Sequence, residues 1–298
     1  MQRFVGWLLK ALAGLPLWLL HALGGAVGWL VYACSPTYRR RFAGNATLAG
    51  VPKAKWRAAV GEAGRALLES PYLWLRPAGQ PISPRPHWRG SEHIDTALAA
   101  GHGIVFLTPH LGSFEVCAQA YAERYGAAHP ITVLYRPARK PWLRETVDRV
   151  RERPGLAAAP ATLAGVRQMM RALRRGHAVG LLPDQVPPAG LGVWAPFFGR
   201  PAYTMTLAAR LVQQTGATPL LAWGERLARG GGYTVHFSPL AEPLPGQAAG
   251  PAASAAAVNR AMESLILHRP EQYLWGYARY KQPRPTGSAA VDAREAHE

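Results

Sequence analysis

Short apolar runs alternate with amphipathic segments of helical length over most of this chain, and this alternation constrains the fold more than any other feature. Runs with the length and character of buried strands occupy residues 103–107, 131–135, 178–182, 219–223 and 233–237. Helical patterns lie at residues 114–125, 141–153, 162–175 and 203–215. Strands that alternate with helices of about 10–15 residues are typical of parallel sheets. The sequence therefore predicts an α/β fold, with a mostly parallel central sheet flanked by helices.

Segments before and after these strands and helices set the bounds of the predicted domain. Residues 45–75 are amphipathic and predict a helix, and the prolines that follow favour extended, irregular chain. Residues 245–257 have low complexity and are interpreted as a surface linker or the frayed start of a helix. These features predict a folded domain over residues 39–282 and a disordered tail over residues 283–298.

The N-terminal segment indicates contact with a membrane. Residues 11–38 carry no formal charge, and such a run is long enough to cross a hydrocarbon core of about 30 Å. Pro16, His21 and a pair of glycines interrupt it, so a helix lying in one leaflet and a buried core helix remain alternatives to a true span. Three arginines follow at residues 39–41, and the positive-inside rule keeps the rest of the chain in the cytoplasm. Residues 1–38 are therefore predicted to anchor the chain in a membrane.

The charge balance predicts an anionic partner. The chain has 34 Lys and Arg against 17 Asp and Glu, a formal net charge of +17. No helix-turn-helix, aromatic RNA-binding motif or zinc finger is recognisable, so a nucleic acid is not expected, whereas acidic lipid head groups are. The two cysteines, Cys34 and Cys117, make no disulfide scaffold and fit no zinc spacing, and no metal site is predicted.

The most specific motif is TPHLGSFE, residues 108–115, between the 103–107 run and the 114–125 helix. Gly112 is suited to a sharp turn and Ser113 to a helix N-cap, and sites form at such strand ends in open α/β sheets. His110 in the loop and Glu115 in the first helical turn are expected to meet. A carboxylate on one imidazole nitrogen fixes the tautomer and raises the basicity of the other. This pair predicts a general base that activates a hydroxyl group.

The chain resembles the lysophospholipid-type acyltransferases and, within them, the late acyltransferases of lipid A biosynthesis. The resemblance rests on segments in the same order and spacing, at residues 110–115, 134–143, 151–155, 173–185, 195–204 and 270–281. It implies a glycerol-phosphate-acyltransferase-like fold without a cofactor. It further implies transfer of a fatty acyl chain from acyl carrier protein to a Kdo-lipid A precursor, at the cytoplasmic face of the bacterial inner membrane.

The resemblance assigns the family's catalytic pair to His110 and Glu115 of the acyltransferase domain, residues 39–282. Its functional arginine falls on Arg151, with Arg153 as a close competitor because the short RER run allows a shifted register.

The family's Asp-Gln element falls on Asp184 and Gln185. Both follow the 178–182 run and are therefore expected at the same sheet edge as His110. The cationic residues Arg136, Arg151 and Arg200 suit phosphate contacts, since a guanidinium offers paired donors. A surface position or an ion pair remains the alternative for each arginine, and Asp184 could orient an arginine or cap a turn.

Departures from the family pattern keep other functions open. The usual Trp-x-His-Arg-Arg-Phe-Lys element reads WGYARYK at residues 275–281, without its His and one Arg. An acyltransferase for another lipid acceptor, such as a lysophospholipid or aminolipid, is therefore the alternative. A non-catalytic protein that binds acidic lipid at the membrane surface is a second one.

Overall fold

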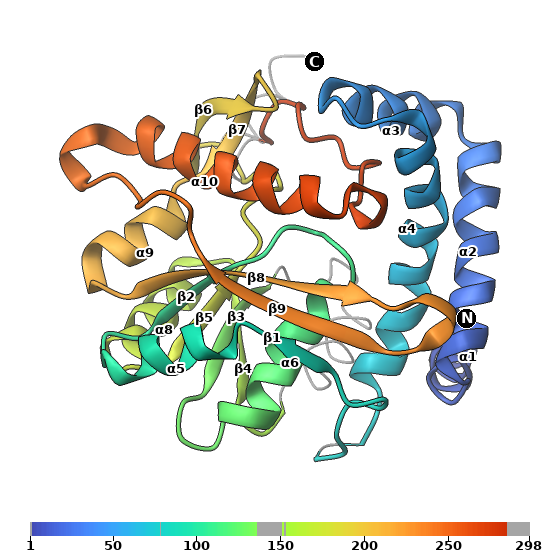
Figure 1. The fold of residues 1–298 in the computed structure, drawn as a ribbon, viewed down its shortest axis with the longest axis horizontal. Coiled ribbons are helices and arrows are strands. Elements are labelled where there is room, and N and C mark those ends of the chain that lie inside the picture. Colours follow the sequence, from blue (N-terminus) through green and yellow to red (C-terminus); the bar gives the residue numbers. More distant parts are fainter. Residues whose placement is uncertain (1, 78, 136–150, 152, 285–298) are drawn as a thin grey trace, which may run out of the picture.

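The computed structural model describes the chain apart from residues 1, 78, 136–150, 152 and 285–298. Its centre is a seven-stranded sheet of order β1-β9-β8-β2-β5-β3-β4 (Figure 1). These strands are β1 (His87–Arg89), β2 (Ile104–Leu107), β3 (Ile131–Tyr135), β4 (Leu156–Pro160), β5 (Ala178–Leu181), β8 (Thr218–Arg226) and β9 (Tyr233–Pro239). The five strands from β8 to β4 are parallel, and β9 pairs antiparallel with β8. The predicted mostly parallel α/β sheet is confirmed.

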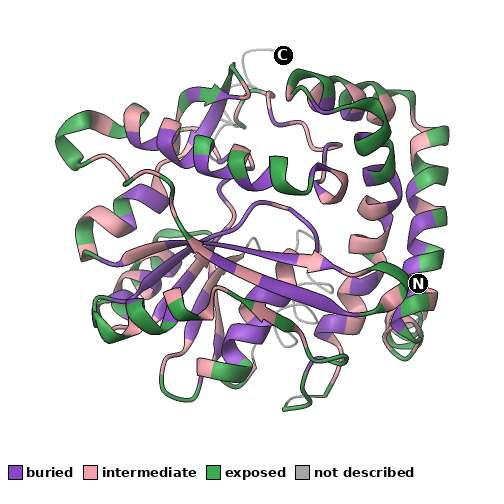
Figure 2. Ribbon diagram, in the orientation of Figure 1, coloured by how far each residue is buried: buried purple, intermediate pink, exposed green. Residues whose placement is uncertain are grey.

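Helices cover both faces of this sheet because its strands alternate in the direction of their side chains. Ile104 and Phe106 of β2 pack with α5 (Ser91–Ala99) and α6 (Phe114–Tyr125). Val105 and Leu107 pack on the other face, with α8 (Leu163–Arg174), α9 (Leu207–Thr215) and α10 (Gly250–His268). Figure 2 shows the buried strands between these two helical layers.

Three sequence predictions need correction. The helix expected over residues 45–75 is two helices, α3 (Pro36–Leu48) and α4 (Lys53–Trp74), separated by a turn that contains Gly50 with φ +69°. The helix expected over 203–215 begins only at α9, because residues 203–205 belong to the hairpin β6 (Gly192–Phe197) and β7 (Arg200–Met205).

The third correction concerns residues 245–257, where the sequence left open a surface linker or the start of a helix: a helix does begin there, and the linker is wrong. The η2 turn (Gln247–Ala249) leads directly into α10, and Ser254, Ala255 and Ala257 of that helix are buried. Small side chains there let the helix pack closely on the hairpin, so low complexity marks a packing surface. Most of the helix expected over 141–153, namely residues 141–150 and 152, and the tail from residue 285 lie outside the described residues.

The N-terminal apolar run folds into α1 (Gln2–Ala13) and α2 (Leu17–Cys34). Among the described residues, α2 is the one helix long and apolar enough to cross a membrane. Helix α2 ends at Cys34, two residues before Pro36. The side chain of Arg39 donates to the carbonyls of Tyr32 and Ala33 in the last turn of α2. Helix α2 lies alongside α4 (Figure 1), with Gly24, Gly28 and Gly64 at the contact.

A buried ion cluster ties α2 and α4 to the sheet. Arg226 at the end of β8 donates to both oxygens of Glu69 at 2.9 and 2.6 Å and to Glu62 at 2.6 Å. The ring of His21, on α2, lies 3.0 Å from Glu69, and the Tyr233 hydroxyl also donates to this carboxylate. Burial alone would raise the pKa of Glu69, but Arg226 and His21 hold it at about 2. Glu69 therefore remains ionised inside the protein.

We expect Glu69→Gln to lower the free energy of unfolding by about 3–5 kcal/mol at neutral pH, because buried Arg226 loses its bidentate carboxylate and keeps only Glu62. The pKa of Glu69 is depressed from 4.5 to about 2, so its contribution exists above the ordinary value and disappears as the pH falls toward about 2. The difference between wild type and variant should shrink over this range. Urea unfolding followed by circular dichroism measures it.

The matched control is Glu242→Gln, which removes a carboxylate from the exposed pair with Arg260. It should change stability by less than about 1 kcal/mol. A Glu69→Gln penalty that stayed constant from neutral to acid pH would contradict this assignment.

Candidate active site

The loop at residues 108–113 leaves the carboxyl end of β2 and enters α6. Strand β2 pairs in parallel with β5, Leu107 opposite Leu181, so the segment after β5 emerges beside this loop. Gly112 has φ +58°, and a Cβ there would lie 2.0 Å from the carbonyl oxygen of Gly224. The expected sharp turn at this glycine is confirmed. Ser113 occupies the N-cap position of α6 as expected, although its side chain makes no capping hydrogen bond.

His110 is held by the two residues that follow β5. Its Nδ1 lies 2.7 Å from Oδ1 of Asp184, and its backbone N–H donates to Oδ2 at 2.9 Å. The side-chain nitrogen of Gln185 lies 2.9 Å from Nε2 on the other side of the ring. This pattern fits a neutral imidazole that donates from Nδ1 and presents the lone pair of Nε2. Asp184 and Gln185 thus share the sheet edge with His110, as the sequence predicted.

Asp184 is almost fully buried and accepts a third hydrogen bond, from the Tyr273 hydroxyl at 3.2 Å. Burial alone would raise the pKa of Asp184. The ring and backbone N–H of His110, together with the charge of Arg279, outweigh burial and lower it. The ionised carboxylate therefore holds the imidazole, and no hydrogen bond of the described residues joins it to an arginine.

Glu115 has other partners, so the expected contact between Glu115 and His110 is wrong. Its carboxylate accepts from the Ser70 hydroxyl at 2.9 Å and from Nη2 of Arg151 at 3.2 Å. In the described part of the chain, no hydrogen bond joins it to the imidazole, whose two nitrogens already face Asp184 and Gln185. The side chains of His110 and Glu115 nevertheless share partial exposure, 17% and 16%.

The structure separates the two arginines that the sequence left open. The guanidinium carbon of Arg151 lies 4.9 Å from the ring centroid of Trp74, in addition to its contact with Glu115. Arg153 instead donates to the carbonyls of Leu73, Trp74 and Arg76 and so caps the end of α4. Of these two arginines, Arg151 is thus the one whose side chain contacts Glu115.

The remaining predicted arginines do not join this cluster in the described structure. Arg136 lies outside the described residues. Arg200 begins β7 and is exposed, with its guanidinium carbon 4.7 Å from the ring centroid of Tyr280. No hydrogen bond or ring contact of the described residues links Arg200 to His110 or Glu115.

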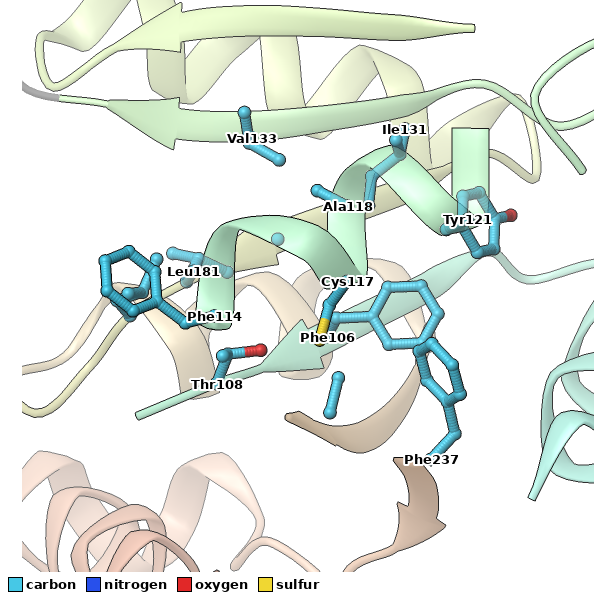
Figure 3. A pocket seen from close by; sticks show the side chains of 13 residues that line it. Phe106, Thr108, Phe114, Cys117, Ala118, Tyr121, Ile131, Val133, Leu181 and Phe237 are labelled. Carbon is cyan, nitrogen blue, oxygen red and sulfur yellow. The ribbon is translucent and has the colours of Figure 1, made fainter. Parts of the chain in front are cut away.

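An apolar pocket lies between α6 and the sheet (Figure 3). Phe114, whose ring centroid is 4.8 Å from that of His110, stands at one end together with Thr108. Tyr121 and Phe237 stand at the other end. The lining is almost entirely hydrocarbon, and the free volume is about 40 Å³, room for a few water molecules. No group of three His, Cys, Asp or Glu that could hold a metal occurs among the described residues.

Gln272 holds the active-site loop, residues 108–113, through hydrogen bonds. The N–H of Gly112 donates to the backbone carbonyl of Gln272, and that of Ser113 donates to Gly224. The side chain of Gln272 accepts from the N–H of Arg226 at 2.9 Å and donates to its carbonyl at 2.8 Å. The loop, β8 and the C-terminal segment therefore form one hydrogen-bonded unit.

Sequence reasoning missed Gln272, Tyr273, Ser70 and the Glu69–Arg226 cluster. The available signals were weak: a polar PEQY stretch inside a segment of the resemblance, and Glu62 and Glu69 seven residues apart on one face of a helix in an acid-poor chain. Their partners are about 40 to 160 residues away, and periodicity does not report such distances.

A strand-end imidazole held by a buried carboxylate, next to an apolar pocket and an Arg–Glu pair, suits an enzyme that transfers an apolar acyl group to a hydroxyl. The comparison with known proteins agrees. The chain belongs to the family described as bacterial lipid A biosynthesis acyltransferase, whose sequence pattern matches residues 3–282. The enzyme class predicted from the sequence, an O-acyltransferase, is confirmed.

Named relatives fit this family. The lipid A biosynthesis palmitoleoyltransferase of Escherichia coli K12 is 27% identical over 229 residues, 76% of this chain and 71% of that protein. The lipid A biosynthesis lauroyltransferase of the same organism is 28% identical over 230 residues, 75% of this chain and 70% of that protein. The phosphatidylinositol mannoside acyltransferase of Mycobacterium tuberculosis is 29% identical over 153 residues, 49% of this chain and 46% of that protein.

Gln272→Ala should loosen the active-site loop. Its two side-chain hydrogen bonds to Arg226 are lost, which costs about 1–3 kcal/mol of stability. The amides of Gly112 and Ser113 should then exchange with deuterium about tenfold faster or more, since loops held by fewer bonds open more often. Exchange mass spectrometry on peptides that cover residues 108–116 measures this.

Gln247→Ala, at an exposed turn, is the control and should leave that exchange unchanged. Equal exchange in the two variants would show that Gln272 does not hold the loop.

Proposed function

We propose that this enzyme moves a fatty acyl chain from the thioester of acyl carrier protein to a hydroxyl of a Kdo-lipid A precursor. The reaction takes place at the cytoplasmic face of the bacterial inner membrane. One observation carries the proposal: the imidazole of His110 stands at the sheet edge with Asp184 on Nδ1, so that Nε2 is available as a base. The family to which the chain belongs supplies the class of acceptor.

The chemistry is direct, base-assisted acyl transfer. Nε2 of His110 takes the proton of the acceptor hydroxyl as the oxygen attacks the thioester carbonyl carbon. The tetrahedral oxyanion then collapses, the carbon–sulfur bond breaks, and the protonated ring returns its proton to the leaving thiolate. The ester and the free thiol are the products. The hydroxyl takes the place beside Nε2 that the amide of Gln185 occupies in this structure.

Two groups near the ring suit the stabilisation of the oxyanion. The N-terminus of α6 begins at Phe114, immediately after the loop, and the first N–H groups of a helix favour negative charge. Arg151, which contacts Trp74 and Glu115, supplies a cation at the first turn of α6. In this proposal Glu115 is a positioning residue for Arg151, and Asp184 serves the imidazole.

The charge of the chain supports anionic substrates. The acceptor carries phosphates and carboxylates, acyl carrier protein is acidic, and the net charge of +17 attracts both. Arg136, Arg151 and Arg200 remain the proposed contacts for these anions. The apolar pocket beside Phe114 is the proposed seat of the first carbons of the acyl chain.

His110→Ala tests the proposal directly. We expect kcat to fall by about 10²–10⁴, because the variant loses the base while the fold remains. The assay follows the transfer of a radiolabelled acyl chain from acyl carrier protein to a purified Kdo-lipid A precursor, with circular dichroism as the check on folding. A folded His110→Ala variant of normal activity would overturn the mechanism.

A comparison of Asp184→Asn with Glu115→Gln distinguishes the roles of the two carboxylates. An amide beside Nδ1 favours the wrong tautomer, so kcat should fall by about 10²–10⁴. Glu115→Gln, which keeps an acceptor for Ser70 but weakens the hold on Arg151, should cost about tenfold. If Glu115→Gln were inactive and Asp184→Asn active, the base would be a His–Glu pair after all.

A different lipid acceptor is the second candidate, and the relative from Mycobacterium tuberculosis named for phosphatidylinositol mannoside favours it. Mass spectrometry of lipid A from cells with and without the protein distinguishes the two candidates. Loss of one secondary acyl chain supports the lipid A precursor, whereas an unchanged lipid A profile with an altered phospholipid or glycolipid supports the alternative.

A further inference from the structure

The outward face of α2 is apolar and exposed. Five of its large side chains, all exposed by 42–62%, are Trp18, Leu23, Trp29, Leu30 and Val31. No residue of α2 itself is charged, because residues 11–38 carry no charge. An 18-residue helix is about 27 Å long. Apolar side chains along this length make a larger exposed patch than the single apolar residues that are normal on a protein surface. We call it the outer face of α2.

The opposite face of α2 is locked to α4. A Cβ on Gly28 would lie 2.3 Å from the carbonyl oxygen of Val60, and one on Gly64 would lie 2.0 Å from that of Gly24, so the two backbones touch. His21 contacts Glu69 from this face, and Arg65 donates to the carbonyl of His21 at 3.2 Å. Separating the helices would break the hydrogen bonds of His21 and expose the packed glycine backbones, which is unfavourable.

Helix α4 cannot follow α2 across a bilayer. It exposes Lys53, Lys55 and Arg57 in its first turns and holds Glu62 and Glu69 beside Arg226 of the sheet. Such charges are costly in hydrocarbon, and the sheet itself belongs in water. Since α2 runs alongside α4, a spanning α2 would carry those charges into the membrane.

The charges around the outer face identify its partner as an anionic lipid surface. The first 61 residues contain no Asp or Glu and eight Lys and Arg, at residues 3, 10, 39–41, 53, 55 and 57. A second copy of the chain would bring two such cationic segments together. Anionic head groups instead neutralise them while the outer face enters the acyl region.

The geometry points to α2 as an in-plane membrane helix: its outer face lies in the cytoplasmic leaflet, and both of its ends remain on the cytoplasmic side. This inference rests on the membrane location in the proposed function and adds how the enzyme meets the bilayer. It does not depend on which residue is the base, and its tests read topology and binding.

Thiol labelling tests the topology. Cys34 is exposed at the C-terminal end of α2, Cys117 is buried, and Gly14 is exposed before its N-terminal end. One chain keeps the native Cys34, and a second carries Gly14→Cys with Cys34→Ser. A third chain carries Gly44→Cys, on α3, with Cys34→Ser, and is the control for the side on which the folded domain lies. A membrane-impermeant maleimide is added to inside-out and right-side-out vesicles of the inner membrane that contain each chain.

All three positions should react only in inside-out vesicles. Labelling of the cysteine at position 14 from the right-side-out face, with position 44 labelled only from the inside, would mean that α2 spans and would overturn the inference. Labelling does not depend on enzymatic activity, so this experiment tests the membrane topology independently of the proposed reaction.

Vesicle binding tests the surface itself. Leu30→Glu, on the outer face, and Leu163→Glu, on α8, change leucines of nearly equal exposure, 62% and 66%. Vesicles that contain phosphatidylglycerol should bind the first variant about tenfold more weakly or worse, and the second as well as wild type. Both should keep acyl transfer to detergent-dispersed substrate. Equal binding by the two variants would contradict the assigned surface.

Discussion

A carboxylate from one strand end holds an imidazole from the next, and the remainder of the site is arranged around this contact. Asp184 binds both the backbone and the ring of His110, so a single residue fixes the position of the loop and the tautomer of the imidazole. The pairing of β2 with β5 sets the distance between them, because a shift of one residue would turn these side chains to opposite faces. Burial keeps this interaction from being screened by water, and Tyr273 completes the shell of the carboxylate.

The sequence predicted the place of the site better than its contacts. Apolar runs followed by polar residues identified the ends of β2 and β5, and parallel strands necessarily bring those ends to one edge. The choice of carboxylate was wrong because the spacing of His110 and Glu115 reports only local reach. Asp184 is 74 residues from His110, and only the sheet order reveals that the two strands are neighbours.

The sequence did not predict the β6–β7 hairpin or the full length of α10, because the composition of each lacks the pattern typical of its structure. Pro196 and Pro201 face each other in the β6–β7 hairpin, where a two-stranded ribbon tolerates residues without an N–H. The alanines of α10 carry no amphipathic contrast, although they pack tightly against β6. In both cases the tertiary contact determines the structure, and local propensity is a poor guide to it.

Helix α4 connects the outer surface of the molecule with its chemistry. Glu69 faces α2 and Arg226, whereas the next residue, Ser70, donates to Glu115 at the site. One turn later, Trp74 lies beneath the guanidinium of Arg151. A rigid helix therefore fixes the distance between the apolar face of α2 and the Arg151–Glu115 pair. If α2 lies in the leaflet as we propose, this fixed distance sets the height of the site above the lipid head groups. The proposed acceptor lipid then presents its hydroxyl to His110 while its existing acyl chains stay in the bilayer.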